Sequence, residues 1–153
     1  PMTILSCSDS RVPPELVFNQ SLGTLFVIRS AGSIADTYGL ASIEYAISEG
    51  YTHLIVVLGH ENCGAVKASM GAGDPESPHL LALATQIRQS FVGVKWDPKD
   101  PEAVKHAVEA NTRASVAALL AQSRVIRDAA MSGKLKIVAA YYDLDTGEVT
   151  TLN

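Results

Sequence analysis

Residues 53–59 form a near-unbroken apolar run, His-Leu-Ile-Val-Val-Leu-Gly. A strand that is apolar along its length is covered on both faces, as in a parallel sheet flanked by helices. Between this run and its neighbours the apolar spacing becomes helical, as at Leu40, Ile43 and Ile47. Three similar runs predict further buried strands, at residues 2–6, 25–28 and 135–142.

The order of these segments predicts an α/β fold. Strands that alternate with helices give a mostly parallel sheet of about four strands, with helices on both faces. Residues 148–152 alternate polar and apolar side chains after the Asp145-Thr146-Gly147 turn, which predicts an antiparallel C-terminal edge strand. We expect a single domain over residues 1–153. Pro1 precedes the first apolar run without a cap or leader, so we expect that an N-terminal segment is missing.

Composition and charge exclude several classes of function. The formal charge of −4 argues against a nucleic-acid binder and against a basic membrane-binding surface. No apolar run approaches the roughly 20 residues that span a bilayer. We therefore expect neither nucleic acid nor a membrane as partner. We expect a cytoplasmic location, which suits reduced thiols.

Two short stretches hold the residues best suited to chemistry, and the chain's two cysteines lie in them: Cys7-Ser8-Asp9-Ser10-Arg11 and His60-Glu61-Asn62-Cys63. Each stretch follows an apolar run, and ligands of open α/β sheets bind beyond the carboxyl ends of the strands. Zinc takes thiolate and imidazole ligands, and catalytic sites leave a fourth position for water or substrate. The pattern predicts one Zn²⁺ held by Cys7, His60 and Cys63.

Asp9 has two alternative roles beside this metal. It lies two residues from Cys7 and two from Arg11, on one side of an extended backbone. It can occupy the fourth position on zinc and exclude water, or it can form an ion pair with Arg11. In the second state a zinc-bound water can lose its proton, and Asp9 can orient the resulting hydroxide. Two thiolates neutralise the charge of Zn²⁺, so its bound water should be less acidic than at an all-histidine site. We therefore expect activity that rises toward alkaline pH.

Each stretch taken alone is weak evidence for a metal. Cysteines are often buried as small hydrophobic residues, and His-x-x-Cys is a short motif. Arg29 ends a predicted strand and is consistent with a plain surface charge.

The two stretches together, with their neighbours, resemble the β-class carbonic anhydrase family. The likeness runs through nearly the whole chain. The motifs that carry it are Cys7-Ser8-Asp9-Ser10-Arg11-Val12-Pro13-Pro14-Glu15, Leu25-Phe26-Val27-Ile28-Arg29, Ile43-Glu44-Tyr45-Ala46, Gly59-His60-Glu61-Asn62-Cys63-Gly64 and Tyr141-Tyr142-Asp143.

The resemblance implies a site and a reaction. Cys7, His60 and Cys63 would bind zinc, and Asp9 with Arg11 would be the catalytic pair. The implied reaction is the reversible hydration of CO₂ to bicarbonate, in a homodimer or larger homo-oligomer with the active site near the subunit interface. The residues that match the family's substrate pocket are Phe26, Ala31, Tyr45 and Gly64.

Some features depart from the family pattern. The family's N-terminal helical arm is not seen in this sequence, and Ser33 stands where relatives often have asparagine, so we expect a less well tied loop after Arg29. Two other functions stay open. One is hydrolysis of carbon disulfide or carbonyl sulfide with the same ligands, and the other is a non-catalytic, zinc-stabilised bicarbonate-sensing or interaction domain.

Overall fold

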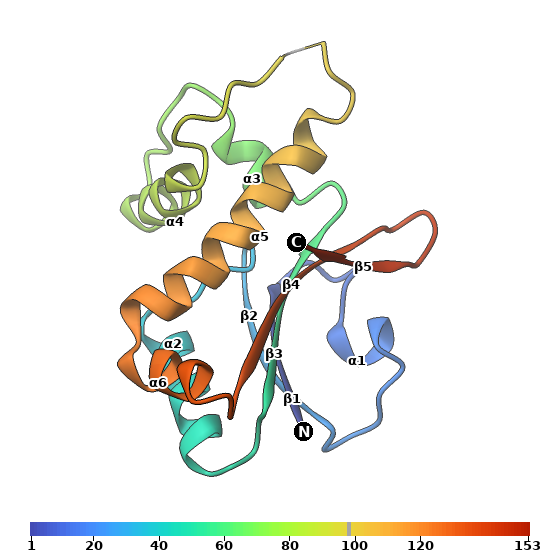
Figure 1. Cartoon of the computed structure of the whole chain (residues 1–153). Helices are drawn as coiled ribbons and strands as arrows, with labels where there is room; N and C mark the ends of the chain where they lie inside the picture. Colours follow the sequence, from blue (N-terminus) through green and yellow to red (C-terminus); the bar gives the residue numbers. More distant parts are fainter. Residues whose placement is uncertain (98) are drawn as a thin grey trace.

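The computed structural model describes residues 1–97 and 99–153 and has one five-stranded sheet in the order β2-β1-β3-β4-β5 (Figure 1). The first four of these strands run parallel, and β5 pairs antiparallel with β4. This arrangement confirms the predicted sheet and its antiparallel edge strand. The strands are β1 Met2–Cys7, β2 Leu25–Ser30, β3 Leu54–His60, β4 Lys136–Tyr142 and β5 Val149–Leu152.

Helices cover the two faces of the sheet unequally (Figure 1). On one face, Leu5 and Val57 pack against α2, α5 and α6 through residues such as Ile43 and Leu119. On the other face, Ile4 and Leu58 are covered by Val17 of the single-turn α1 and by neighbouring loop residues. Helices on both faces are thus confirmed. The helices are α1 Pro14–Val17, α2 Thr37–Ser48, α3 Gly64–Ser69, α4 Pro78–Gln89, α5 Ala103–Gln122 and α6 Arg124–Met131.

The long helix α5 begins after Asp100 and Pro101, although Asp followed by Pro is a common start of a helix. Its first residue is Ala103, and no side chain caps its amino end. The Asp100 carboxylate instead accepts a hydrogen bond from the backbone N–H of Glu102, at 2.9 Å. Asp side chains that bond two residues ahead stabilise turns in competition with the helix. Because of this turn, the helix begins only at Ala103.

A close approach between β3 and α5 fixes the end of the strand. A Cβ atom added at Gly59 would lie 2.2 Å from Thr112 Oγ1 and 2.8 Å from Val108 Cγ1. Only a residue without a side chain lets the helix lie this near the strand. Gly59 immediately precedes His60, so this contact sets the position of the functional end of β3.

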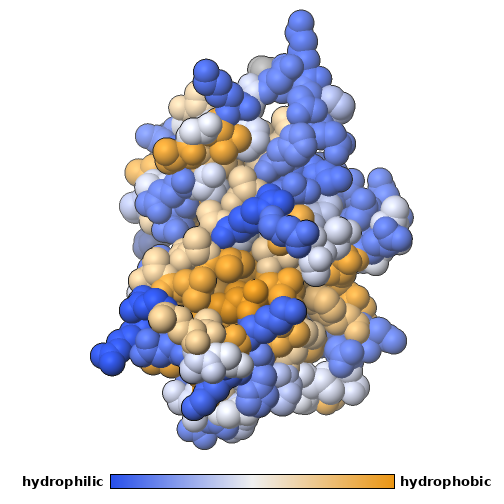
Figure 2. All heavy atoms as spheres, viewed as in Figure 1, coloured by the Kyte–Doolittle hydropathy of each residue, from blue (hydrophilic) through white to orange (hydrophobic). Residues whose placement is uncertain are grey.

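The outer edge of β4 is only partly paired. On this edge β5 pairs with residues 139–142, while residues 136–138 pair with β3 on their inner side and have no second strand partner within the described part of the chain. Figure 2 shows hydrophobic side chains gathered on the surface of the molecule over the region of β4 and α5. A groove of about 420 Å³ runs here, lined by Arg113, Val116, Lys136, Ile137, Val138, Ala139, Thr151, Leu152 and Asn153.

Among the helices in residues 1–97 and 99–153, none has the length and apolar character needed to cross a bilayer.

Candidate metal centre

Three buried side chains converge at the carboxyl ends of two neighbouring strands. Cys7 ends β1, His60 ends the adjacent β3, and Cys63 immediately precedes α3. One ligand atom from each, two sulfurs and an imidazole nitrogen, all lie within 4.8 Å of one another. The predicted grouping of Cys7, His60 and Cys63 is therefore present in the structure.

The sulfur atoms of Cys7 and Cys63 are hydrogen-bonded to each other. Cys7 Sγ and Cys63 Sγ lie 4.0 Å apart. The hydrogen bond with Cys63 is the main cause that lowers the pKa of Cys7 to about 4, and two backbone N–H groups lower it further. The pKa of Cys63 is raised, because its proton is held by Cys7 and because the thiol is buried. One thiolate is thus already favoured.

The imidazole of His60 is oriented for ligation. Its Nδ1 lies 2.8 Å from the Glu61 carbonyl oxygen, which can only accept, so Nδ1 carries the proton. Its Nε2 is buried and makes no hydrogen bond within the described residues. A buried nitrogen left without a partner is unfavourable unless an unseen group satisfies it.

This donor set fits zinc. Two sulfurs at zinc–sulfur bond length and a tetrahedral angle lie roughly 3.8 Å apart, close to the observed separation of 4.0 Å. Backbone oxygen orients the imidazole, as is usual for metal-binding histidines. Three protein ligands leave one position open, which is the arrangement of catalytic zinc sites.

Asp9 is paired with Arg11 in this structure. Arg11 Nη2 lies 2.7 Å from Asp9 Oδ2, Arg11 Nε lies 3.0 Å from Oδ1, and the Arg11 backbone N–H also donates to Oδ1. These hydrogen bonds hold the pKa of Asp9 well below its usual range. Asp9 Oδ2 is 3.9 Å from His60 Nε2, so the ionised carboxylate lies at the edge of the ligand cluster. Of the two alternatives for Asp9, the structure has the pair with Arg11.

Arg29 is exposed, as a surface charge would be, but its guanidinium also holds two backbone groups beside the candidate ligands. Its Nε donates to the Cys7 carbonyl at 2.8 Å and its Nη2 to the Asp9 carbonyl at 2.5 Å. The side chain therefore fixes the backbone on both sides of Ser8. A motif search could not have found this role, because the acceptors are backbone atoms 20 and 22 residues away.

The loop after β2 is also better tied than the serine at position 33 suggested. The buried Ser33 hydroxyl donates to the Leu58 carbonyl of β3 at 2.8 Å. The next residue toward the amino end, Gly32, donates its N–H to Cys7 Sγ at 3.4 Å. This loop therefore forms one wall of the metal centre.

The four predicted pocket residues fall into two groups. Ala31 precedes Gly32 and Gly64 follows Cys63, so both lie beside the metal ligands. Phe26 pairs with Thr3, four residues before Cys7 along the strands, which is about 13 Å from the ligand end. Its ring lies 6.5 Å from that of the exposed Tyr45. A single chain therefore does not bring all four residues to one pocket.

An apolar cavity of about 470 Å³ lies next to the first group. Ala31 and Ala65 form its wall toward the metal ligands, and Leu80 and Leu83 come from α4. On its rim, Arg88 bonds to Asp74 and to the carbonyls of residues 69, 71 and 73, so its guanidinium is already engaged. The cavity suits a small uncharged molecule.

Comparisons with known proteins match this chain to carbonic anhydrases. A family model described as carbonic anhydrase matches residues 2–149. Carbonic anhydrase 2 of Mycobacterium tuberculosis is 37% identical over 147 residues, covering 94% of this chain and 70% of that protein. The carbonic anhydrase of Mycolicibacterium smegmatis is 37% identical over 152 residues, covering 95% and 71%. The crystallised Coccomyxa β-carbonic anhydrase, in complex with acetazolamide, superposes with a TM-score of 0.89 at 27% identity, covering 99% of this chain and 71% of that one.

Proposed function

This chain belongs to the β-carbonic anhydrase family, and from that premise we propose that it catalyses the reversible hydration of CO₂ to bicarbonate and a proton. The observation that carries the proposal is the buried Cys7-His60-Cys63 cluster with the Asp9–Arg11 pair at its edge. A metal that only stabilised the fold would not require an ionised, arginine-paired carboxylate beside it.

We propose that Cys7, His60 and Cys63 hold a zinc ion. When bound, zinc is a Lewis acid that brings the deprotonation of a water molecule close to neutral pH. The His60 Nδ1 proton, bonded to the Glu61 carbonyl, keeps Nε2 available as a ligand. The two cysteine sulfurs would supply the anionic ligands.

Asp9 acts as the hydrogen-bond acceptor that orients the attacking water. Arg11 keeps the carboxylate ionised and engages both of its oxygens, so the carboxylate cannot rotate freely. Arg29 holds the Asp9 backbone from the opposite side. Because Asp9 is paired with Arg11, its carboxylate would not bind the zinc, and the remaining coordination position would be left to water or substrate. The apolar cavity bordered by Ala31 and Ala65 is suited to uncharged CO₂.

We further propose that the active unit is a homodimer or a larger homo-oligomer. The support is the separation of Phe26 and Tyr45 from the proposed metal ligands of their own chain, together with the position of the partly buried Phe26 on the edge strand β2 and of the exposed Tyr45 beside it. If they line a substrate pocket, it is the pocket of a second copy. Analytical ultracentrifugation showing only monomer at working concentration would contradict this proposal. A cytoplasmic location stays a prediction, since both ligand thiols must remain reduced.

The decisive test is stopped-flow CO₂ hydration on protein of measured zinc content, from about pH 7 to about pH 9. We expect fast turnover that rises with pH. Asp9→Asn should retain zinc and lose most of this activity, because the amide cannot replace the ionised acceptor. Asp128→Asn is the matched control, since Asp128 also pairs with an arginine, Arg124, but on the exposed face of α6.

Two results would overturn the proposal. Zinc-loaded protein without CO₂ turnover would do so, and turnover of carbon disulfide or carbonyl sulfide in its place would identify the alternative enzyme. An Asp9→Asn variant as active as the parent would favour a zinc whose role is structural.

A further inference from the structure

Gly32 occupies a position that only glycine can fill. Its backbone has φ +83°, in the left-handed region that other residues rarely adopt. A Cβ atom here would also lie 2.7 Å from Ile87 Cδ1 of α4. The turn packs tightly against α4 and directs the Gly32 N–H at Cys7 Sγ, 3.4 Å away. Gly32 therefore supplies a backbone hydrogen bond to a predicted metal ligand.

Asn111 holds the other end of the same residue. It lies on α5, is 3% exposed, and its Nδ2 donates to the Gly32 carbonyl oxygen at 2.7 Å. The two residues are 79 positions apart in the chain. Gly32 is thus fixed at both its polar groups, by Asn111 on one side and by the Cys7 sulfur on the other. A flexible glycine turn would not hold its N–H on a sulfur atom without such a contact.

We propose that Asn111 is a positioning residue of the metal centre, which acts through Gly32 to keep an N–H···S hydrogen bond on Cys7. The inference rests on the proposed zinc-binding role of Cys7. A hydrogen bond to a thiolate withdraws electron density from the sulfur, so the sulfur donates less charge to its metal. This matters in a site with two thiolates, because their combined charge would otherwise neutralise the ion and weaken it as a Lewis acid.

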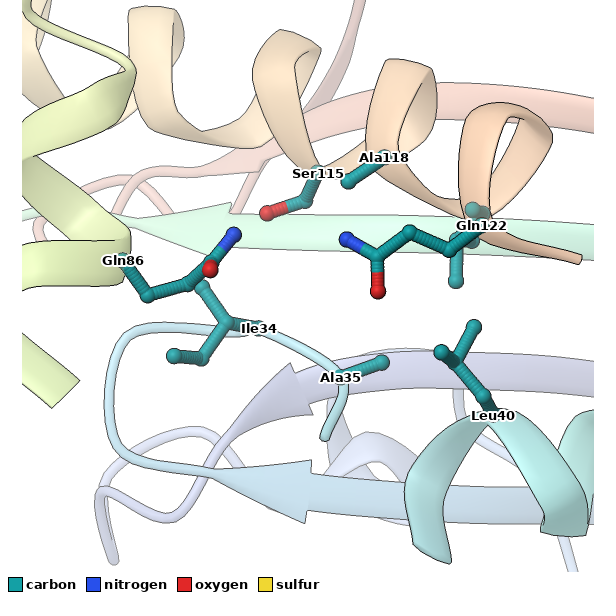
Figure 3. A pocket seen from close by; sticks show the side chains of 8 residues that line it. Ile34, Ala35, Leu40, Gln86, Ser115, Ala118 and Gln122 are labelled. Carbon is teal, nitrogen blue, oxygen red and sulfur yellow. The ribbon is translucent and has the colours of Figure 1, made fainter. Parts of the chain in front are cut away.

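The surroundings of Asn111 offer a matched control. Ser115 lies one turn further along α5 and is also buried. Figure 3 shows its hydroxyl directed into a small cavity that is lined by Gln86, Gln122 and Ile34. The Ser115 hydroxyl makes no hydrogen bond within the described residues. Ser115→Ala therefore removes a buried polar group from the same helix and leaves the hydrogen bond between Asn111 and Gly32 in place.

The first test uses the unaltered chain loaded with ¹¹³Cd in place of zinc. A hydrogen bond from the Gly32 N–H to a cadmium-bound sulfur transmits scalar coupling between that proton and the metal nucleus. We expect this coupling in the NMR spectrum of the folded protein. Its absence, with Cys7 shown to bind cadmium, would overturn the proposal without any variant.

The second test uses Asn111→Asp, which keeps the shape of the side chain but places a carboxylate oxygen against the Gly32 carbonyl. We expect the Gly32 coupling to be lost and the sulfur-to-metal charge-transfer band of cobalt-loaded protein to move to longer wavelength. Metal affinity should fall roughly tenfold to a hundredfold, as for other partners that orient ligands. Ser115→Ala should leave all three unchanged, and Asn111→Asp with parental values would overturn the proposal.

If Asn111→Asp fails to fold, Asn111→Ala and the measurement on the unaltered chain still decide the question. These readouts do not depend on turnover. A protein that shows the coupling and the band shift but does not hydrate CO₂ would refute the proposed function and leave the role of Asn111 intact.

Discussion

Replacing Gly59 by alanine tests whether the close contact between β3 and α5 positions the site. The added Cβ would lie 2.2 Å from Thr112 Oγ1 and 2.8 Å from Val108 Cγ1. Both neighbours are buried and belong to the same turn of α5 that carries Asn111. Neither is the end of a long flexible side chain, so the helix itself must move away from the strand.

The expected magnitude follows from this overlap. Overpacking a well-filled core by one methyl group costs about 1–3 kcal/mol. For a chain of this size, 1 kcal/mol lowers the melting temperature by about 2–4 °C. We therefore expect Gly59→Ala to melt roughly 2–12 °C below the parent. His60 adjoins the site of the change, so metal affinity should fall as well.

A double-mutant cycle separates this contact from other effects. Thr112→Ala removes the nearest atom but also the hydrogen bond from Thr112 Oγ1 to the Val108 carbonyl, worth about 1 kcal/mol. The loss of unfolding free energy in the double variant, measured by urea unfolding, should be smaller than the sum of the two single losses by roughly 1 kcal/mol or more. Gly73→Ala is the control, because a Cβ there meets no atom within 4 Å. Gly59→Ala with parental stability and metal affinity would refute the reasoning.

Three further predictions concern the metal centre. Chelation removes the partner of His60 Nε2. It should lower the melting temperature by roughly 8–16 °C, relative to protein at a metal concentration about 1,000 times the dissociation constant. Equal melting temperatures in calorimetry would contradict metal binding at this site. Arg29→Ala should reduce kcat/KM roughly tenfold to a hundredfold, because two hydrogen bonds to the Cys7 and Asp9 carbonyls are lost; an unchanged value in stopped-flow assays would remove Arg29 from the site. The low pKa of Asp9 in the folded protein stabilises the fold above the ordinary carboxyl pKa, and this stability is lost as pH falls through the lowered value. Arg11→Ala should therefore raise the pKa of Asp9, measured by NMR titration, and move the acid limb of the activity profile to higher pH.

Local pattern was enough to predict the sheet and the ligand cluster. Continuous apolar runs identified the four parallel strands, and Cys7, His60 and Cys63 could be grouped because the carboxyl ends of neighbouring parallel strands meet. The start of α5 at Ala103 could not be predicted from local pattern, because aspartate both caps helices and stabilises turns, and the side chain of Asp100 stabilises a turn here.

The supports of the site could not be read from sequence. Arg29, Asn111 and Ser33 all donate to backbone carbonyls on distant segments. Every residue has such a carbonyl, so no residue type marks the acceptor. The separation of Phe26 and Tyr45 from the metal ligands likewise depends on strand register, which fixes distance along the sheet only once the pairing is known.

The spacing of the proposed ligands has a consequence for how the protein would acquire a metal ion. His60 and Cys63 are neighbours in the chain and can capture an ion as soon as this segment forms. Cys7 lies 56 residues before Cys63, and closing a loop of that length costs about 4 kcal/mol of chain entropy. When an ion already held by His60 and Cys63 also binds Cys7, the binding free energy can offset part of this entropy cost and bring β1 against β3. The metal would then act as a template for the central strand pair, and refolding should be faster when it is present from the start.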